Sequence, residues 1–244
     1  MKIQNLHLQN VRKNAVDNLH QDYVYHQQYV SNANIELTYR CPLQCPQCFR
    51  AYLGLDDDHK KKIEMKEKIK ESYDMPLDDF RKICNFFKDN ISLCGQFSDP
   101  VYHPEFFEIL KICTNEYPNC TFKIHTAGHQ KNIEWYKKAF ELSGPNITWI
   151  FGLDGLADTS HMYRKNQNSQ LIFDAIMLGS EMQKNIRWQF IVFAFNEHQI
   201  ETARQICKDK NIKFHLVYTD RKQGNVKLAS DKYRAKGNIK EYHE

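Results

Sequence analysis

Three cysteines lie close together near the start of the chain, as Cys41, Cys45 and Cys48, with the spacing C-x3-C-x2-C. Three thiolates on one loop can converge on a metal, but they cannot all pair with one another as disulfides. A structural zinc site usually has four ligands in two separated pairs, and no second pair follows here. The pattern instead suits an iron–sulfur cluster with one iron left open. A zinc loop completed by a distant histidine and three unrelated cysteines are the alternatives.

Other residues that could do chemistry stand directly after predicted strands. Their segments read, in chain order, GQFSDP, TAGH, GLDGL, FNEH and YTD. Ligands of parallel α/β proteins bind beyond the carboxyl ends of the strands. We therefore expect these segments and the cysteine loop to form one site.

Strand patterns alternate with helical patterns along the chain. Helices are predicted around Phe80–Phe87 and at 104–115, 132–143, 169–183 and 197–209, and strands at 35–38, 91–94, 121–125, 147–151, 188–195 and 212–218. Alternation of this kind predicts right-handed βαβ units and a parallel sheet. Six strands are too few for a full eight-stranded barrel. Two architectures remain compatible with the sequence pattern, an open partial barrel and a flat doubly wound sheet.

With its C-x3-C-x2-C loop directly after the first strand, the chain resembles the radical SAM (S-adenosylmethionine) superfamily over roughly residues 34–218. The resemblance implies an α/β fold, a partial (β/α)6 TIM-like barrel with a parallel sheet. It also implies a [4Fe-4S] cluster held by Cys41, Cys45 and Cys48, whose open iron chelates the amino and carboxylate groups of SAM. One electron, from a donor such as flavodoxin or ferredoxin, would split SAM into methionine and a 5′-deoxyadenosyl radical. That radical would remove a hydrogen atom from a substrate.

The turn after the second strand resembles the Gly-Gly-Glu-Pro turn of the family. It implies that Gly95, Gln96 and Asp99 bind SAM, with Asp99 accepting a charge-assisted hydrogen bond from the ammonium group. A plain Asp-Pro turn is the alternative. Thr126 begins a segment similar to the Thr-Asn-Gly turn of the family and is a further predicted contact.

Two more residues are predicted to bind SAM from the resemblance. Asp154 lies in a Gly-Leu-Asp-Gly segment similar to the Ser-Ile-Asp-Gly segment of the family, with Gly152 where a serine is common. Arg164 matches an arginine that pairs with the SAM carboxylate, because a planar guanidinium can bind a carboxylate bidentately. An ordinary surface arginine is the alternative, and no residue is assigned as catalytic.

Composition places the chain among folded proteins. It has 244 residues, of which 41% are hydrophobic and 13% aromatic, which argues against disorder. No apolar run reaches about 18 residues, which predicts no membrane span. The polar start is no secretory signal. We therefore expect a cytoplasmic protein.

The predicted domains are an N-terminal lead (1–33), a core (34–218) with a charged insertion (52–75), and a basic tail (219–244). Residues 221–240 contain seven Lys and Arg residues and one acid, Asp231. A solvated tail is one interpretation, and an arm that binds nucleic acid is the other. The substrate is thus left open among nucleic acid, peptide and small metabolite. A non-catalytic metal- or iron–sulfur-binding module is the alternative function.

Overall fold

In the computed structural model of the chain, the structure describes residues 32–48, 50, 73–95, 98–128, 131–219, 222–223, 226–233 and 241–243. Consecutive parallel strands pair with one another in a single sheet, so chain order and spatial order coincide. These strands are β1 (Asn32–Ile35), β2 (Asn90–Leu93), β3 (Thr121–Thr126), β4 (Ile147–Gly152), β5 (Asn185–Ile191) and β6 (Lys213–Val217). The predicted α/β class with six parallel strands is confirmed, and the singly wound order is that of an open partial barrel.

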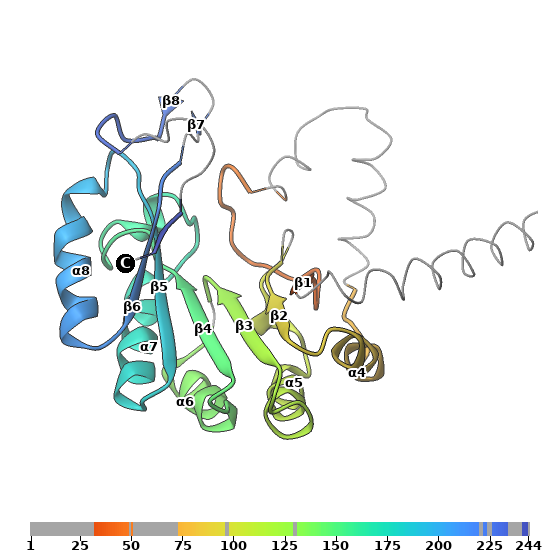
Figure 1. Ribbon diagram of the computed structural model, residues 1–244. Helices are drawn as coiled ribbons and strands as arrows, with labels where there is room; N and C mark the ends of the chain where they lie inside the picture. The colour runs from red at the N-terminus through yellow and green to blue at the C-terminus, as the bar shows by residue number, and fades with distance from the viewer. Residues whose placement is uncertain are drawn as a thin grey trace, which may run out of the picture.

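The helices cover one side of this sheet, as Figure 1 shows. They are α4 (Leu77–Phe86), α5 (Phe106–Lys111), α6 (Ile133–Leu142), α7 (Ser169–Glu181) and α8 (Ile200–Asp209). Alternate strand side chains pack against them. Trp149 of β4 meets Phe106 of α5 and Phe140 of α6, with ring centroids 6.0 and 5.3 Å apart. The intervening side chains must therefore point to the opposite, concave face.

Two strands end at other residues than the sequence predicts, and hydrogen bonds of the Thr38 and Asn196 side chains account for the difference. The first strand ends at Ile35, and Thr38 instead forms an isolated bridge with Asp74. The fifth strand ends at Ile191, not 195, because Asn196 intervenes. Its side chain accepts a hydrogen bond from Phe193 N–H at 2.7 Å and donates to the Ile191 carbonyl at 3.0 Å, which turns the chain out of the sheet.

Part of the segment predicted as a basic tail packs on the core. The segment also contains the two-residue strands β7 (Lys222–Gln223) and β8 (Val226–Lys227), and β9 (Glu241–His243) pairs antiparallel with β6. Ser230 is buried and donates a hydrogen bond to Glu197, while Tyr233 stacks on Tyr218 with centroids 6.0 Å apart. Most of the predicted lead and insertion, and the predicted contact Gln96, lie outside the described residues.

None of the helices in these described ranges has both the length and the apolar character that crossing a membrane requires.

Candidate cofactor site

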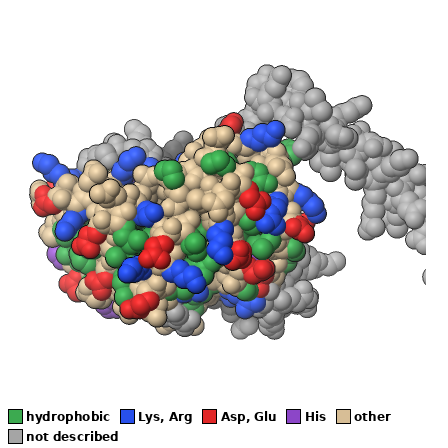
Figure 2. Space-filling model, turned by 90° about the horizontal axis from the view of Figure 1, so that it is seen from below, with side chains coloured by type: hydrophobic (Ala, Val, Ile, Leu, Met, Phe, Trp, Pro, Cys, Tyr) green, Lys and Arg blue, Asp and Glu red, His purple; other side chains and the backbone are tan. Residues whose placement is uncertain are grey.

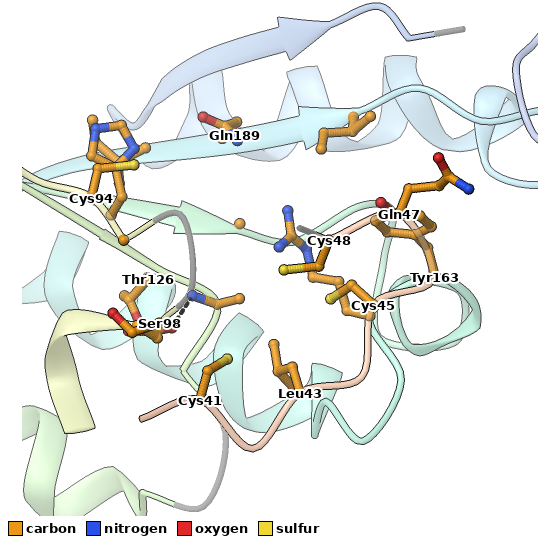
Figure 3. A pocket seen from close by; sticks show the side chains of 18 residues that line it. Cys41, Leu43, Cys45, Gln47, Cys48, Cys94, Ser98, Thr126, Tyr163 and Gln189 are labelled. Carbon is orange, nitrogen blue, oxygen red and sulfur yellow. Dashed lines mark hydrogen bonds between the residues drawn. The ribbon is translucent and has the colours of Figure 1, made fainter. Parts of the chain in front are cut away.

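A cavity of about 520 Å³ opens at the carboxyl ends of the strands. Figure 3 shows the side chains that line it. The structure brings seven of the predicted site residues into its wall: Cys41, Cys45, Cys48, Gly95, Asp99, Thr126 and Arg164. The strand-end segments after β2, β3 and β4 thus meet at one cavity, with the cysteine loop as one side. No described residue of the FNEH and YTD segments, which were expected in the same site, lines this cavity.

The cysteine loop is tied to the sheet at both ends. At its base, Asp99 N–H donates to the Arg40 carbonyl at 3.0 Å, which joins the loop to the turn after β2. At its tip, Gln44 N–H donates to the Lys165 carbonyl at 3.1 Å, which joins it to the segment after β4. The loop therefore spans the cavity between two strand ends.

A second anchor holds the start of the loop. Arg40 makes a bidentate contact with Asp74, with its closest nitrogen 2.7 Å from the carboxylate, and Thr38 donates to the same carboxylate at 2.6 Å. Burial alone would raise the pKa of Asp74, but the hydrogen bonds from Arg40 and Thr38 lower it below its ordinary value. Asp74 is therefore an ionised anchor at neutral pH.

The three thiols face a shared space. Figure 3 shows the sulfur atoms of Cys45 and Cys48 pointing to the same side, with Cys41 farther along the loop. Burial, followed by the nearby Asp99 carboxylate, raises the pKa of Cys41 to about 12, so iron binding would have to displace its proton.

Three thiols on one loop are a donor set that a four-iron cluster uses, because such a cluster takes each thiolate on a different iron. Among the residues that the structure describes, no three Cys, His, Asp or Glu side chains are arranged to hold a single metal ion.

Asp99 is buried at the cavity wall, with 4% of its surface exposed. One carboxylate oxygen accepts hydrogen bonds from Thr126 Oγ1 at 2.9 Å and Ala127 N–H at 2.8 Å, and the other accepts from Val101 N–H at 3.3 Å. Burial raises the pKa of Asp99, and these hydrogen bonds oppose that rise. Thr126 thus lies in the site chiefly as a donor that orients Asp99.

The turn that carries Asp99 requires a glycine at position 95. A Cβ at Gly95 would collide with the side chain and carbonyl of Ser98 and lie 2.5 Å from the Glu36 carboxylate. Ser98 donates a hydrogen bond to that same carboxylate across the turn. Gly95 therefore serves the close packing of this turn against Glu36, the residue that follows β1.

Arg164 is not a surface arginine. Its side chain is 13% exposed, and its Nε lies 2.8 Å from Asp154 Oδ2 in an ion pair with the fully buried Asp154. Burial alone would lower the pKa of Arg164, but the Asp154 carboxylate raises it further above its ordinary value. Asp154 also accepts a hydrogen bond from Ile191 N–H at 2.9 Å. Asp154 therefore holds Arg164 and does not itself line the cavity.

Gly152 makes room for this arrangement. A Cβ at Gly152 would lie 2.7 Å from Arg164 Nη2. The glycine thus replaces the expected serine at a point where the guanidinium lies against the backbone.

The sequence analysis missed several residues of the site. Gln167 donates to the carbonyls of Ala127 at 2.8 Å and Gly152 at 3.0 Å, which ties the ends of β3 and β4 together. Cys94 and His125 line the cavity from the strands, as does Gln189. Their alternating positions on strands are a signal that sequence reasoning could have used.

His125 is a neutral polar group in the cavity. Burial, and then the charges of Lys123, Arg187 and His215, lower the pKa of His125 to about 4. At neutral pH it can therefore donate or accept a hydrogen bond without adding charge.

Solved structures share this fold. SuiB of Streptococcus suis bound to S-adenosylmethionine superposes with a TM-score of 0.63 at 18% identity, over 92% of this chain and 48% of that one. SuiB bound to its precursor peptide SuiA superposes with a TM-score of 0.58 at 19% identity, over 85% of this chain and 43% of that one. The structure of anSMEcpe with AdoMet and the Cp18Cys peptide superposes with a TM-score of 0.54 at 14% identity, over 80% of this chain and 54% of that one.

The chain has the radical SAM fold. The resemblance seen in the cysteine loop is thereby confirmed at the level of the fold. The chain spans about half the length of these solved structures. No protein-family model matches the sequence, and no curated protein is similar to it.

Proposed function

We propose that the protein is a radical SAM enzyme, in which Cys41, Cys45 and Cys48 hold a [4Fe-4S] cluster and SAM occupies the adjoining cavity. One observation carries the proposal: the three thiols of one loop open into the same cavity as Asp99 and Arg164, in a chain with this fold. When bound and reduced by a donor such as flavodoxin or ferredoxin, the cluster and SAM would supply a 5′-deoxyadenosyl radical that removes a hydrogen atom from the substrate.

The residues of the cavity would bind SAM by its two charged ends. Among the described residues, Asp99 Oδ1 accepts one long hydrogen bond, from Val101 N–H, so it can accept another from the SAM ammonium group. Arg164 directs Nε and Nη2 to Asp154, which leaves Nη1 for the SAM carboxylate. Charge-assisted contacts of this kind are about twice as strong as neutral ones.

A peptide is the substrate class that we favour. Structures with this fold are solved with the precursor peptide SuiA and with the Cp18Cys peptide. A nucleic acid attracted by the basic residues of 221–240 and a small metabolite are the competing classes. Tyr233, which could have stacked on a base, is already stacked on Tyr218.

The test is anaerobic reconstitution with iron and sulfide, followed by reduction in the presence of SAM. We expect iron–sulfur absorbance and release of 5′-deoxyadenosine. Cys45→Ala should abolish both, whereas Cys207→Ala should change neither, because Cys207 is buried on α8 among apolar side chains. Full iron content in the Cys45 variant would refute the assignment. Binding of zinc without visible absorbance would favour the metal-binding module instead.

A further inference from the structure

The concave face of the sheet carries three cations next to the cavity. They are Lys123 on β3, Arg187 on β5 and Lys213 on β6, and we refer to them as the basic face. Their neighbours in sequence fix their direction, because Phe122 and Trp188 are fully buried and contact α4 and α7. Alternation along a strand then points Lys123 and Arg187 to the other side of the sheet.

The strand register places the basic face next to residues that line the cavity. His125, Ile150, Arg187 and Lys213 are partners across β3, β4, β5 and β6, and thus form one row. His125 and Ile150 line the cavity. Arg187 and Lys213 continue the same row of the sheet beyond the residues that line it. Lys123 stands on the same face, one row below His125.

Two cations of the basic face lie close enough together to act on the same group, His125. Lys123 and Arg187 stand on different strands, yet both disfavour protonation of His125, and His215 on β6 acts in the same direction. Arg187 and Lys213 are direct register partners on neighbouring strands. Strands lie about 4.8 Å apart, so Lys123 and Arg187, two strands apart, are separated by roughly 10 Å across the sheet.

No described acidic side chain forms an ion pair with any of the three cations. Elsewhere the described arginines Arg40, Arg81, Arg164 and Arg204 each have a carboxylate partner. Glu36, which follows β1 at the opposite edge of the sheet from β6, accepts a hydrogen bond from Ser98 in the turn after β2. Figure 2 shows acidic and basic side chains interspersed on another surface of the molecule. The basic face therefore stands out as a positive surface without a described counter-charge.

The composition of the concave face indicates the kind of anion. The positions that β2 to β6 place on this face hold Lys, Arg, His, Gln, Thr, Ser, Asn and small or aliphatic residues, and none holds Phe, Tyr or Trp. At the edge of the sheet, β9 adds Glu241 and His243, the register partners of Val217 and His215. Binding of single-stranded nucleic acid ordinarily uses aromatic rings on which bases stack. Carboxylates need only cations and hydrogen-bond donors, which this face supplies.

We propose that the basic face binds acidic side chains of a peptide substrate and thereby holds the peptide next to the cavity. The proposal rests on the proposed function for its catalytic meaning, but the binding itself does not require SAM cleavage. Residues of an extended peptide repeat every 3.3 Å or so, and alternate side chains share a face. Two acids at nearby positions can therefore reach both Lys123 and the Arg187–Lys213 pair.

The experiment measures binding of a fluorescein-labelled hexaglutamate peptide to the full-length, reconstituted protein by anisotropy. A hexaglutamine peptide is the neutral probe. We expect hexaglutamate alone to bind, with an affinity that falls as salt is added. Lys123→Gln and Arg187→Gln should each weaken binding about tenfold, the effect of losing one hydrogen bond between charged groups. Arg187→Lys should retain most of the affinity because it keeps the charge.

The matched control is Lys137→Gln, which removes an exposed cation from α6 on the helix side of the sheet. It should leave hexaglutamate binding unchanged. Equal binding of the two peptides, or equal loss in the Lys137 and Lys123 variants, would overturn the proposal. A single-stranded oligonucleotide that binds more tightly than hexaglutamate and depends on Lys123 would overturn the choice of a peptide.

The variants also separate this proposal from the proposed function. Lys123→Gln and Arg187→Gln should keep full iron content and uncoupled SAM cleavage, because neither residue is among those that line the cofactor cavity. Peptide binding that depends on Lys123 in a protein that does not cleave SAM would refute the proposed function and leave the binding site standing. SAM cleavage in a protein that does not bind hexaglutamate would refute the binding site and leave the proposed function standing.

Discussion

Replacement of Asp154 by asparagine tests whether the Asp154–Arg164 pair builds the cofactor site. Asp154 is fully buried and Arg164 is 13% exposed, so the asparagine variant leaves a guanidinium largely desolvated without its counter-charge. Removal of one partner of a buried ion pair costs about 3–5 kcal/mol. Because Arg164 borders the cavity and can reach water there, we expect the lower end, ~3 kcal/mol.

The expected loss can be measured by thermal unfolding. In a chain of this size each kcal/mol shifts Tm by about 2–4 °C, so Asp154→Asn should lower Tm by roughly 6–12 °C. The same variant should weaken SAM binding about tenfold by isothermal titration, because Arg164 loses the partner that orients it. Iron content should stay unchanged.

A surface pair provides the matched control. Arg204 and Glu201 form an ion pair on α8 with side chains 34% and 76% exposed. Exposed pairs of this kind contribute about 0.3–0.5 kcal/mol, so Glu201→Gln should shift Tm by no more than about 2 °C. The double variant Asp154→Asn/Arg164→Met should recover part of the lost stability, because it removes the unpaired charge.

Two results would refute the reasoning separately. If Asp154→Asn changes Tm no more than Glu201→Gln does, the Asp154–Arg164 pair is not as buried as it is in the structure. If Tm falls while the dissociation constant for SAM stays the same, Arg164 does not hold the SAM carboxylate, and the pair only stabilises the fold.

Three further predictions concern the cavity. Asp99→Asn should weaken SAM binding about 10- to 100-fold in a titration with iron content retained, and an unchanged Kd would remove Asp99 from the site. Gly152→Ala should lower both Tm and SAM affinity, since its methyl group would lie 2.7 Å from Arg164 Nη2; wild-type values in both measurements would contradict this geometry. The pKa of His125 is about 4 in the folded protein against 6.5 ordinarily, so the unfolded chain takes up the proton first as pH falls. The free energy of unfolding should therefore drop by up to ~3 kcal/mol between about pH 6.5 and 4 in urea titrations, and His125→Gln should flatten that drop.

The fold was predictable because its signals are local. Alternation of short apolar strands with helical patterns needs only neighbouring residues, and it gave the class and the strand count. The strand ends depended on distant partners. Thr38 leaves the first strand because it bonds Asp74, 36 residues away, and Asn196 ends the fifth strand through its side chain.

For the site, the sequence predicted several residues that line the cavity but not which side chains they contact. The rule that ligands lie beyond strand ends brought Cys41, Asp99, Thr126 and Arg164 together correctly. The partnership of Asp154 with Arg164 could not be read from the sequence, because it depends on how the chain turns after β4. The role of Gln167 could not be predicted for the same reason, since its two carbonyl partners lie at the ends of different strands.

The charges of the concave face are consistent with two ligands that differ in charge. Near the cysteine loop, the Asp154–Arg164 pair is neutral as a unit and Asp99 adds a carboxylate. SAM has a sulfonium, an ammonium and a carboxylate, so it is a net cation and matches that end. The basic face is positive, so it repels SAM and attracts carboxylates. A chain that places an acid near the cysteine loop and cations on the basic face would thereby keep its cofactor and an acidic peptide in separate places on the concave face.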